Sequence, residues 1–105
     1  MEFIVIYSTV PNKNEGKKIA KALVEHHLAA CVNLIDKVES VFSWDGEICD
    51  EKEVLMIIKT KKELFEKVKF IVQKLHSYTV PELIALPIIQ ADETYLKWIE
   101  HETED

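Results

Sequence analysis

The sequence predicts one α+β domain in which helices cover one face of an antiparallel sheet. Two stretches with the apolar spacing of amphipathic helices alternate with strand-like runs, and an Asp-Gly pair separates two long strand-like segments. The chain has 105 residues, 48% of them hydrophobic, and a net charge of −6. This length is typical of one domain, so we expect residues 1–105 to form a single domain.

The first part of the chain predicts a strand followed by a helix. Residues 3–7 are β-branched or aromatic, as is typical of a buried strand. Asn12 and Glu15 have the spacing of a helix N-cap and an acid that reaches back to it. Apolar residues then recur at helical spacing until the helix ends near residues 28–29; they are Ala20, Leu23, Val24 and Leu28.

Asp45-Gly46 predicts a two-residue hairpin turn between strands at 30–44 and 47–60. In that register Glu39 lies opposite Lys52, and this pair of opposite charges supports the pairing. A strand over residues 30–44 is about 50 Å long when extended. A domain of this size has a radius of gyration of about 13 Å. We therefore expect the hairpin to extend beyond its own domain or to pair with another chain.

The second half predicts a helix, a strand and a further helix. Thr60 and Glu63 have the spacing of a capping box. An amphipathic helix follows with apolar residues at Leu64, Val68, Ile71, Val72 and Leu75. After a loop at 76–82, residues 83–89 predict a strand in which Pro87 requires an edge position or a bulge. Asp92 is the expected N-cap of a terminal helix. The β-α-β-β-α-β order with an added C-terminal helix predicts a ferredoxin-like sandwich with a long hairpin.

The composition disfavours several functions that such folds carry. Residues 48–60 hold no aromatic residue and no glycine, unlike the third strand of an RNA-recognition module. The chain has no arginine, which disfavours enzymes that grip a phosphate with a guanidinium group. The negative net charge disfavours nucleic acids and anionic membranes as partners.

The cysteines and the termini point to a cytoplasmic protein. Cys31 and Cys49 form no Cys-x-x-Cys metal motif, and in the expected hairpin they lie about 36 Å apart, too far for a disulfide. No apolar run reaches the length of a membrane-spanning helix. The chain start lacks the basic residues of a signal peptide. We therefore expect a cytoplasmic location.

Six segments, in order along the chain, resemble the CutA, or divalent-cation tolerance, proteins. They are residues 7–11, 28–33 and 44–47, Glu53 with 59–60, and residues 76–82 and 95–98. The resemblance implies a cytoplasmic, ferredoxin-like homotrimer linked to tolerance of copper and other divalent metals, with Cu²⁺ or another divalent cation as a ligand. Our leading interpretation is a protein that is not an enzyme. Because 48% of the residues are hydrophobic, we expect the core to form without a metal.

The resemblance further implies one candidate metal ligand. Some family members are proposed to hold copper with a Cys at the end of the first strand and adjacent histidines before a Tyr. The matching positions here are Ser8, Leu75 and His76, so that only His76 retains a metal-binding side chain. A transition metal normally takes three or four N, S or O ligands. We therefore expect His76 to need further ligands, such as Glu82 or groups from a neighbouring chain.

Two further groups of residues are candidates for contacts between copies. Four polar residues are expected to converge in a cleft between subunits at one end of the sheet: Asn33, Lys59, Tyr78 and Glu82. Phe42 and Trp44 lie at or near the hairpin tip, where a monomer would expose them. Large apolar residues in such a place usually mark an interface, so we expect both in the trimer contact.

Two other functions remain open at this point. The first is a module similar to the PII-type signal proteins, which would bind a small anionic metabolite between subunits. The second is a hydrolase or lyase that uses Lys59, His76 and Glu82. The lack of arginine and of a Gly-rich phosphate loop counts against a nucleotide ligand.

Overall fold

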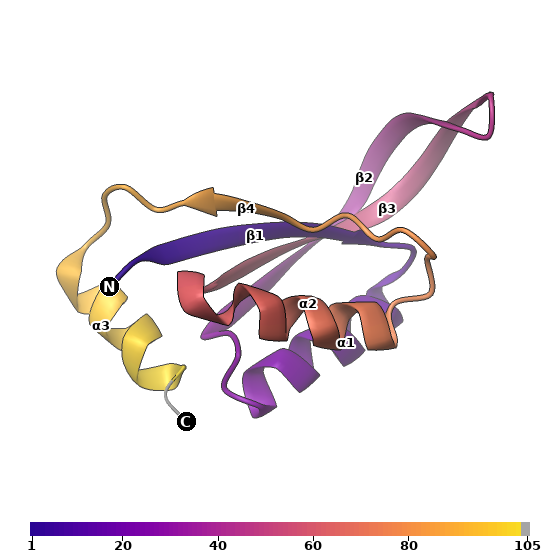
Figure 1. Ribbon diagram of the computed structural model, residues 1–105. Coiled ribbons are helices and arrows are strands. Elements are labelled where there is room, and N and C mark those ends of the chain that lie inside the picture. The colour runs from indigo at the N-terminus through magenta and orange to yellow at the C-terminus, as the bar shows by residue number, and fades with distance from the viewer. Residues whose placement is uncertain (104–105) are drawn as a thin grey trace.

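The computed structural model describes residues 1–103 and has the predicted order of elements, so the α+β fold class is confirmed (Figure 1). The elements are β1 (Phe3–Val10), α1 (Lys13–Glu25), β2 (Cys31–Trp44), β3 (Glu47–Lys61), a 3₁₀ turn (Lys62–Leu64), α2 (Phe65–Leu75), β4 (Ile84–Pro87) and α3 (Glu93–Glu102). No helix within residues 1–103 is long and apolar enough to cross a membrane.

The four strands form one antiparallel sheet in the order β2-β3-β1-β4. β1 lies inside the sheet and pairs with β3 on one side and β4 on the other. β4 is an edge strand and is shorter than the expected strand at 83–89. Pro87 is the last residue of β4, where a missing N–H removes no bond from the interior of the sheet.

Helices α1 and α2 cover one face of the sheet (Figure 1). Alternate residues of β1 and β3 point to these helices, because successive side chains of a strand face opposite ways. The core that results contains Ile6, Ile19, Leu23, Met56, Ile58, Val68 and Val72, all fully buried. The opposite face has no such cover over much of its area, and Ile35, Ile84 and Leu86 are exposed there.

The hairpin has the predicted register near its tip, with Glu39 opposite Lys52 and a turn at Asp45-Gly46. Asp45 and Gly46 both have positive φ, which matches the twist of the strands that they join. The hairpin projects away from the helices (Figure 1), and the molecule measures 44 × 25 × 22 Å. A bulge that was not predicted lies between Ile35 and Val38 and shifts the register by one residue.

The capping box expected at Thr60 is wrong. β3 continues through Thr60 to Lys61, and the Thr60 hydroxyl donates instead to the carbonyl of Leu28 at 2.6 Å. This bond ties β3 to the segment that joins α1 and β2. No side chain within residues 1–103 caps the 3₁₀ turn before α2.

The cap expected for α1 is half confirmed. Asn12 accepts a hydrogen bond from the backbone N–H of Glu15 at 2.9 Å, as predicted. The carboxylate of Glu15 does not return to Asn12 but accepts two hydrogen bonds from Ser77. Asp92 caps α3 as predicted, by accepting from the N–H of Tyr95 at 3.1 Å.

Candidate functional site

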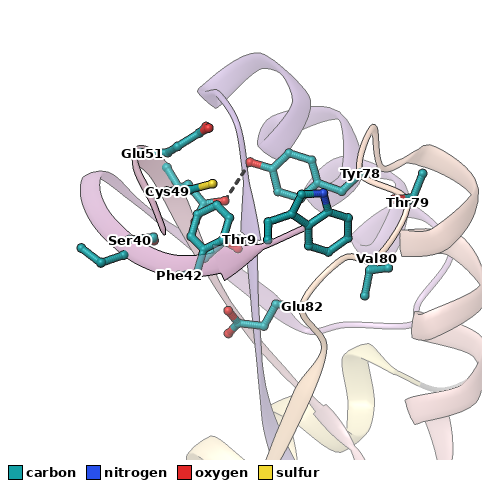
Figure 2. A pocket seen from close by; sticks show the side chains of 12 residues that line it. Thr9, Ser40, Phe42, Cys49, Glu51, Tyr78, Thr79, Val80 and Glu82 are labelled. Carbon is teal, nitrogen blue, oxygen red and sulfur yellow. Dashed lines mark hydrogen bonds between the residues drawn. The ribbon is translucent and has the colours of Figure 1, made fainter. Parts of the chain in front are cut away.

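An open cleft of about 650 Å³ lies between the hairpin and the loop that joins α2 to β4 (Figure 2). Side chains of β2 and β3 line one side, and residues of the loop line the other. The cleft is within the size range of small-molecule sites, which is about 300–1,000 Å³. Its lining residues include the aromatic side chains of Phe42, Trp44 and Tyr78 and the carboxylates of Glu51, Glu53 and Glu82.

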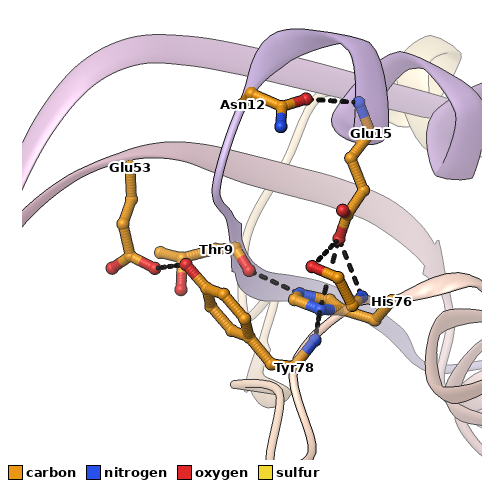
Figure 3. A network of polar contacts seen from close by, with 7 residues as sticks. Thr9, Asn12, Glu15, Glu53, His76 and Tyr78 are labelled. Atoms are coloured by element: carbon orange, nitrogen blue, oxygen red, sulfur yellow. Dashed lines mark hydrogen bonds and ion pairs between the residues drawn. The ribbon is translucent and has the colours of Figure 1, made fainter.

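A hydrogen bond between Tyr78 and Glu53 joins the two sides of the cleft. Glu53 lies on β3 and is 7% exposed, and its Oε2 accepts from the Tyr78 hydroxyl at 2.8 Å (Figure 3). Burial raises the pKa of Tyr78 well above its usual range, and the hydrogen bond to Glu53 and the charge of Glu53 raise it further. The phenol is therefore a neutral donor at physiological pH.

The cleft carries excess negative charge. Burial raises the pKa of Glu82, and the neighbouring charge of Glu53 raises it further. Glu51 contributes a third carboxylate, and none of the described lining residues is basic. Like charges held at a partly dehydrated surface repel one another and attract a cation.

His76 fixes the start of the loop (Figure 3). Its Nε2 donates to the carbonyl of Thr9 at 2.7 Å, and its Nδ1 accepts the backbone N–H of Tyr78 at 3.0 Å. These two bonds require a neutral ring with its proton on Nε2, because a carbonyl only accepts and a backbone N–H only donates. The ring has no exposed surface.

Glu15 of α1 completes this network. Its Oε2 accepts the N–H and the hydroxyl of Ser77, both at 3.0 Å, and lies 3.4 Å from His76 Nδ1. The His76 and Tyr78 rings also pack together, with centroids 4.7 Å apart. The loop is thus held against β1 and α1, and this arrangement sets the position of Tyr78 in the cleft.

The geometry does not suit the metal site expected at His76. Both ring nitrogens of His76 are engaged by the backbone, so neither has a lone pair directed at an added ion. Leu75 supplies no ligand atom, and the buried Ser8 hydroxyl has no hydrogen-bond partner among the described residues. Residues 1–103 contain no cluster of three or more His, Cys, Asp or Glu side chains that could hold a metal ion. His76 instead positions the loop.

Within a single chain, the four polar residues expected to converge in a cleft between subunits lie as two pairs. Lys59 Nζ donates to Asn33 Oδ1, so these two residues do lie together. Tyr78 and Glu82 lie with Glu53, and a strand from Glu53 to Lys59 spans about 20 Å. The same separation keeps Lys59 away from Glu82, and the buried His76 ring faces neither. The catalytic group considered from the sequence is therefore not assembled within the chain.

Sequence reasoning placed Phe42 and Trp44 at an interface but missed their part in lining the cleft. It also missed Glu53 as a member of the site. One signal was present, since Glu53 directly precedes the apolar run at 54–58 and a carboxylate there lies next to a buried segment.

Comparison with known proteins identifies the family. The sequence pattern of the family described as CutA1 divalent ion tolerance protein matches residues 4–102. The chloroplastic CutA protein of Arabidopsis thaliana is 46% identical over 100 residues, which are 95% of this chain and 55% of that protein. The divalent-cation tolerance protein CutA of Thermus thermophilus is 44% identical over 99 residues, which are 94% of this chain and 96% of that protein. This chain thus spans only about half the length of the plant protein.

Solved structures show the same fold. The Cut A1 protein of Thermus thermophilus superposes with a TM-score of 0.94 at 43% identity, covering 97% of this chain and 99% of that chain. CutA1 of Oryza sativa superposes with a TM-score of 0.96 at 42% identity, covering 100% of this chain and 96% of that chain. These matches confirm the resemblance found in the sequence motifs, and the chain belongs to the CutA1 divalent ion tolerance protein family.

Proposed function

We propose that this chain acts in the tolerance of divalent cations, copper among them, as a cytoplasmic homotrimer that catalyses no reaction. Membership of a family named for divalent ion tolerance is the observation that carries the proposal. The Thermus thermophilus relative, which matches this chain over nearly its whole length, also carries the name divalent-cation tolerance protein.

The exposed apolar surface of the single chain supports the assembly. Beyond the uncovered face of the sheet, the hairpin exposes Val41, Phe42, Trp44 and Ile48. Patches of this kind on a soluble chain are typical of contacts with other copies, and a long unpaired strand edge invites pairing. Rotational symmetry lets each copy cover the next and leaves no open edge. Symmetry alone leaves the number of subunits open, and the resemblance to the family implies three.

In this proposal the chain folds without a metal, because its core consists of packed apolar side chains. The metal response also does not depend on His76, whose nitrogens serve the loop. The alternative of a small anionic ligand is disfavoured at this cleft, because three carboxylates line it.

Two measurements test the proposal. Light scattering should give a mass of about 37 kDa, three times 12.2 kDa, at micromolar concentration. A stable monomer would overturn the assembly. In a bacterial strain that lacks its own member of the family, this chain should raise the CuSO₄ concentration that stops growth, compared with the empty vector. Equal growth with the chain and with the empty vector would overturn the role in tolerance.

A further inference from the structure

We propose that the outer surface of α1 and α2 binds an acidic segment of another protein, with an apolar side chain of that segment placed on Phe70. We call this surface the lysine face; its exposed residues are Lys17, Lys18, Lys21, Lys67, Phe70 and Lys74. The proposal goes beyond the proposed function and does not depend on it. The proposed assembly uses the hairpin and the open face of the sheet, whereas α1 and α2 lie side by side on the opposite face (Figure 1). The lysine face is therefore left accessible when copies associate.

The charge of α1 and α2 is opposite to that of the whole chain. The two helices contain seven lysines and three glutamates. The rest of the chain contains six lysines and sixteen acidic residues, and the net charge of the chain is −6. One of the helical glutamates, Glu15, is turned to Ser77 and His76 and so does not neutralise the lysine face. A positive region on a negative molecule attracts negative groups to that region alone.

The lysines of this face are available to a ligand. All five are exposed, and none of them forms an ion pair within residues 1–103. The helical lysines that do have a partner are Lys13, which lies 4.0 Å from a carboxylate oxygen of Asp36, and Lys69, which lies 3.8 Å from one of Glu66. An incoming carboxylate can therefore pair with the lysine face without breaking an existing ion pair.

Phe70 gives the lysine face an apolar contact. Its side chain is 64% exposed, whereas the other apolar side chains of α2 belong to the core or pack against it. Lys67 and Lys74 lie three positions before and four positions after Phe70, so both flank its ring on the same side of the helix. A segment that carries carboxylates around an apolar side chain matches this arrangement, because the carboxylates can pair with the lysines while the apolar side chain covers the ring.

The lysine face suits a protein segment better than a membrane or a nucleic acid. A helix that lies on a membrane buries a whole apolar face in it, whereas the apolar faces of α1 and α2 are buried in the core, as Leu23 and Val68 show. A nucleic acid is a long polyanion that would also meet the acidic remainder of the chain, and the chain has no arginine to grip its phosphates. A short acidic segment contacts the lysine face alone and avoids this repulsion.

Fluorescence anisotropy of three dye-labelled peptides, titrated with the full chain at low salt, tests the proposal. The first peptide repeats Glu-Glu-Leu four times, the second has Gln in place of every Glu, and the third has Ala in place of every Leu. We expect saturable binding of the first, at least about tenfold weaker binding of the second, and about fivefold weaker binding of the third. Equal affinity for the first two would overturn the acidic ligand, and equal affinity for the first and third would overturn the contact with Phe70. The whole proposal would be overturned by no saturable binding of the first peptide up to about 1 mM.

Variants locate the binding. Lys67→Gln with Lys74→Gln should weaken the Glu-Glu-Leu peptide about fivefold to tenfold. The matched control, Lys37→Gln with Lys97→Gln, removes the same charge from two exposed lysines outside α1 and α2 and should leave the affinity within about twofold. Phe70→Ala should weaken the Glu-Glu-Leu peptide about fivefold but leave the peptide without Leu within about twofold. Equal effects of the two double variants would overturn the proposed site.

Competition separates the kinds of partner. Vesicles of equal parts phosphatidylcholine and phosphatidylserine, or a DNA duplex, are added to the chain with the Glu-Glu-Leu peptide bound, at the same concentration of negative charge as an unlabelled peptide control. We expect the unlabelled peptide to displace the labelled one and the vesicles and the duplex to leave it bound. Stronger displacement by vesicles or by DNA would overturn a protein segment as the partner. Light scattering on the same samples keeps the two proposals apart, since a monomer that binds the peptide would overturn the assembly alone.

Discussion

Tyr78 donates its phenolic hydrogen to the carboxylate of Glu53 at 2.8 Å, and this bond links the loop after α2 to the base of the hairpin. The two residues are 25 positions apart in the sequence, and neither belongs to the closely packed core between helices and sheet. The contact therefore adds a polar link between the loop and the hairpin, next to the core residue Val54.

Replacing Tyr78 by Phe should lower the free energy of unfolding by about 1–3 kcal/mol, because Glu53 stays buried and loses a hydrogen-bond donor. Urea unfolding followed by circular dichroism measures the change. Tyr95→Phe is the matched control, since its side chain is 41% exposed and its hydroxyl makes no hydrogen bond within residues 1–103. A loss of the same size in both variants would contradict the assigned role of the bond.

The same bond predicts a loss of stability at high pH. The folded chain holds the Tyr78 proton more tightly than the unfolded chain, because burial and Glu53 raise the pKa of this phenol. The contribution is complete below the ordinary tyrosine pKa of about 10 and declines as the pH rises from there toward the folded value. The stability gap between wild type and Tyr78→Phe should therefore narrow from about pH 9 to about pH 11.5. All other side chains are the same in both proteins, so the comparison removes their effect. A gap that widens would refute the argument.

His76→Ala should destabilise the chain by about 2–4 kcal/mol, because the carbonyl of Thr9 and the N–H of Tyr78 both lose their partner inside the protein. The exposed His101 provides a control, and His101→Ala should change stability by less than about 0.5 kcal/mol. Calorimetric titration of the folded fraction of the His76→Ala variant with CuCl₂ should give the same number of copper ions bound per chain as the wild type. A lost copper site would restore His76 as a metal ligand.

In the hairpin, local sequence signals predict the turn and the nearby register but not the bulge. Asp45-Gly46 requires positive φ at both positions, and such a turn leaves one register for the strands near it. The bulge at Asp36 and Lys37 was not predictable, because neither residue is a glycine that would signal positive φ. Asp36 stabilises it locally, since its Oδ1 accepts the N–H of Lys37 at 2.8 Å.

Asn33 and Lys59 do lie together, but the predicted register does not account for their contact. A register fixed by Asp45-Gly46 alone would place Asn33 opposite Ile58, so that Lys59 would face the other side of the sheet. The bulge before Val38 moves Asn33 opposite Ile57, on the same face as Lys59, and Lys59 Nζ donates to Asn33 Oδ1. The position of Tyr78 depends on how a loop folds back over β1, and that depends on the buried ring of His76. Propensity and spacing carry no information on such a contact, which is formed between distant segments.

Lys37→Gly should stabilise the chain by about 1 kcal/mol, because Lys37 has a φ of 61°, a conformation that costs a non-glycine residue about 1–2 kcal/mol. Lys52→Gly, in the regular part of the neighbouring strand, should destabilise by about 0.5–1 kcal/mol, since glycine there adds chain entropy to the unfolded state and removes the charge opposite Glu39. Thermal unfolding of both variants checks the opposite signs. A lower unfolding temperature for Lys37→Gly than for the wild type would contradict this prediction. It would show that the Lys37 side chain adds more stability than its positive φ costs.

The hairpin should be the part of the chain on which assembly depends. Its strands extend past the helices, so the side chains near its tip have no core of their own to join (Figure 1). Phe42 and Trp44 lie on one side of β2, two residues apart, and in a ring of copies they would be buried against a neighbour.

The double change Phe42→Glu with Trp44→Glu places charges at every contact, and an unpaired charge in a buried contact is strongly unfavourable. Light scattering should then give a mass of about 12 kDa in place of about 37 kDa, or the chain should unfold. Ser43→Glu, which adds a charge to the opposite side of the same strand, should leave the larger mass unchanged. If the double variant kept the wild-type mass, the contact between copies would have to lie elsewhere, on the uncovered face of the sheet.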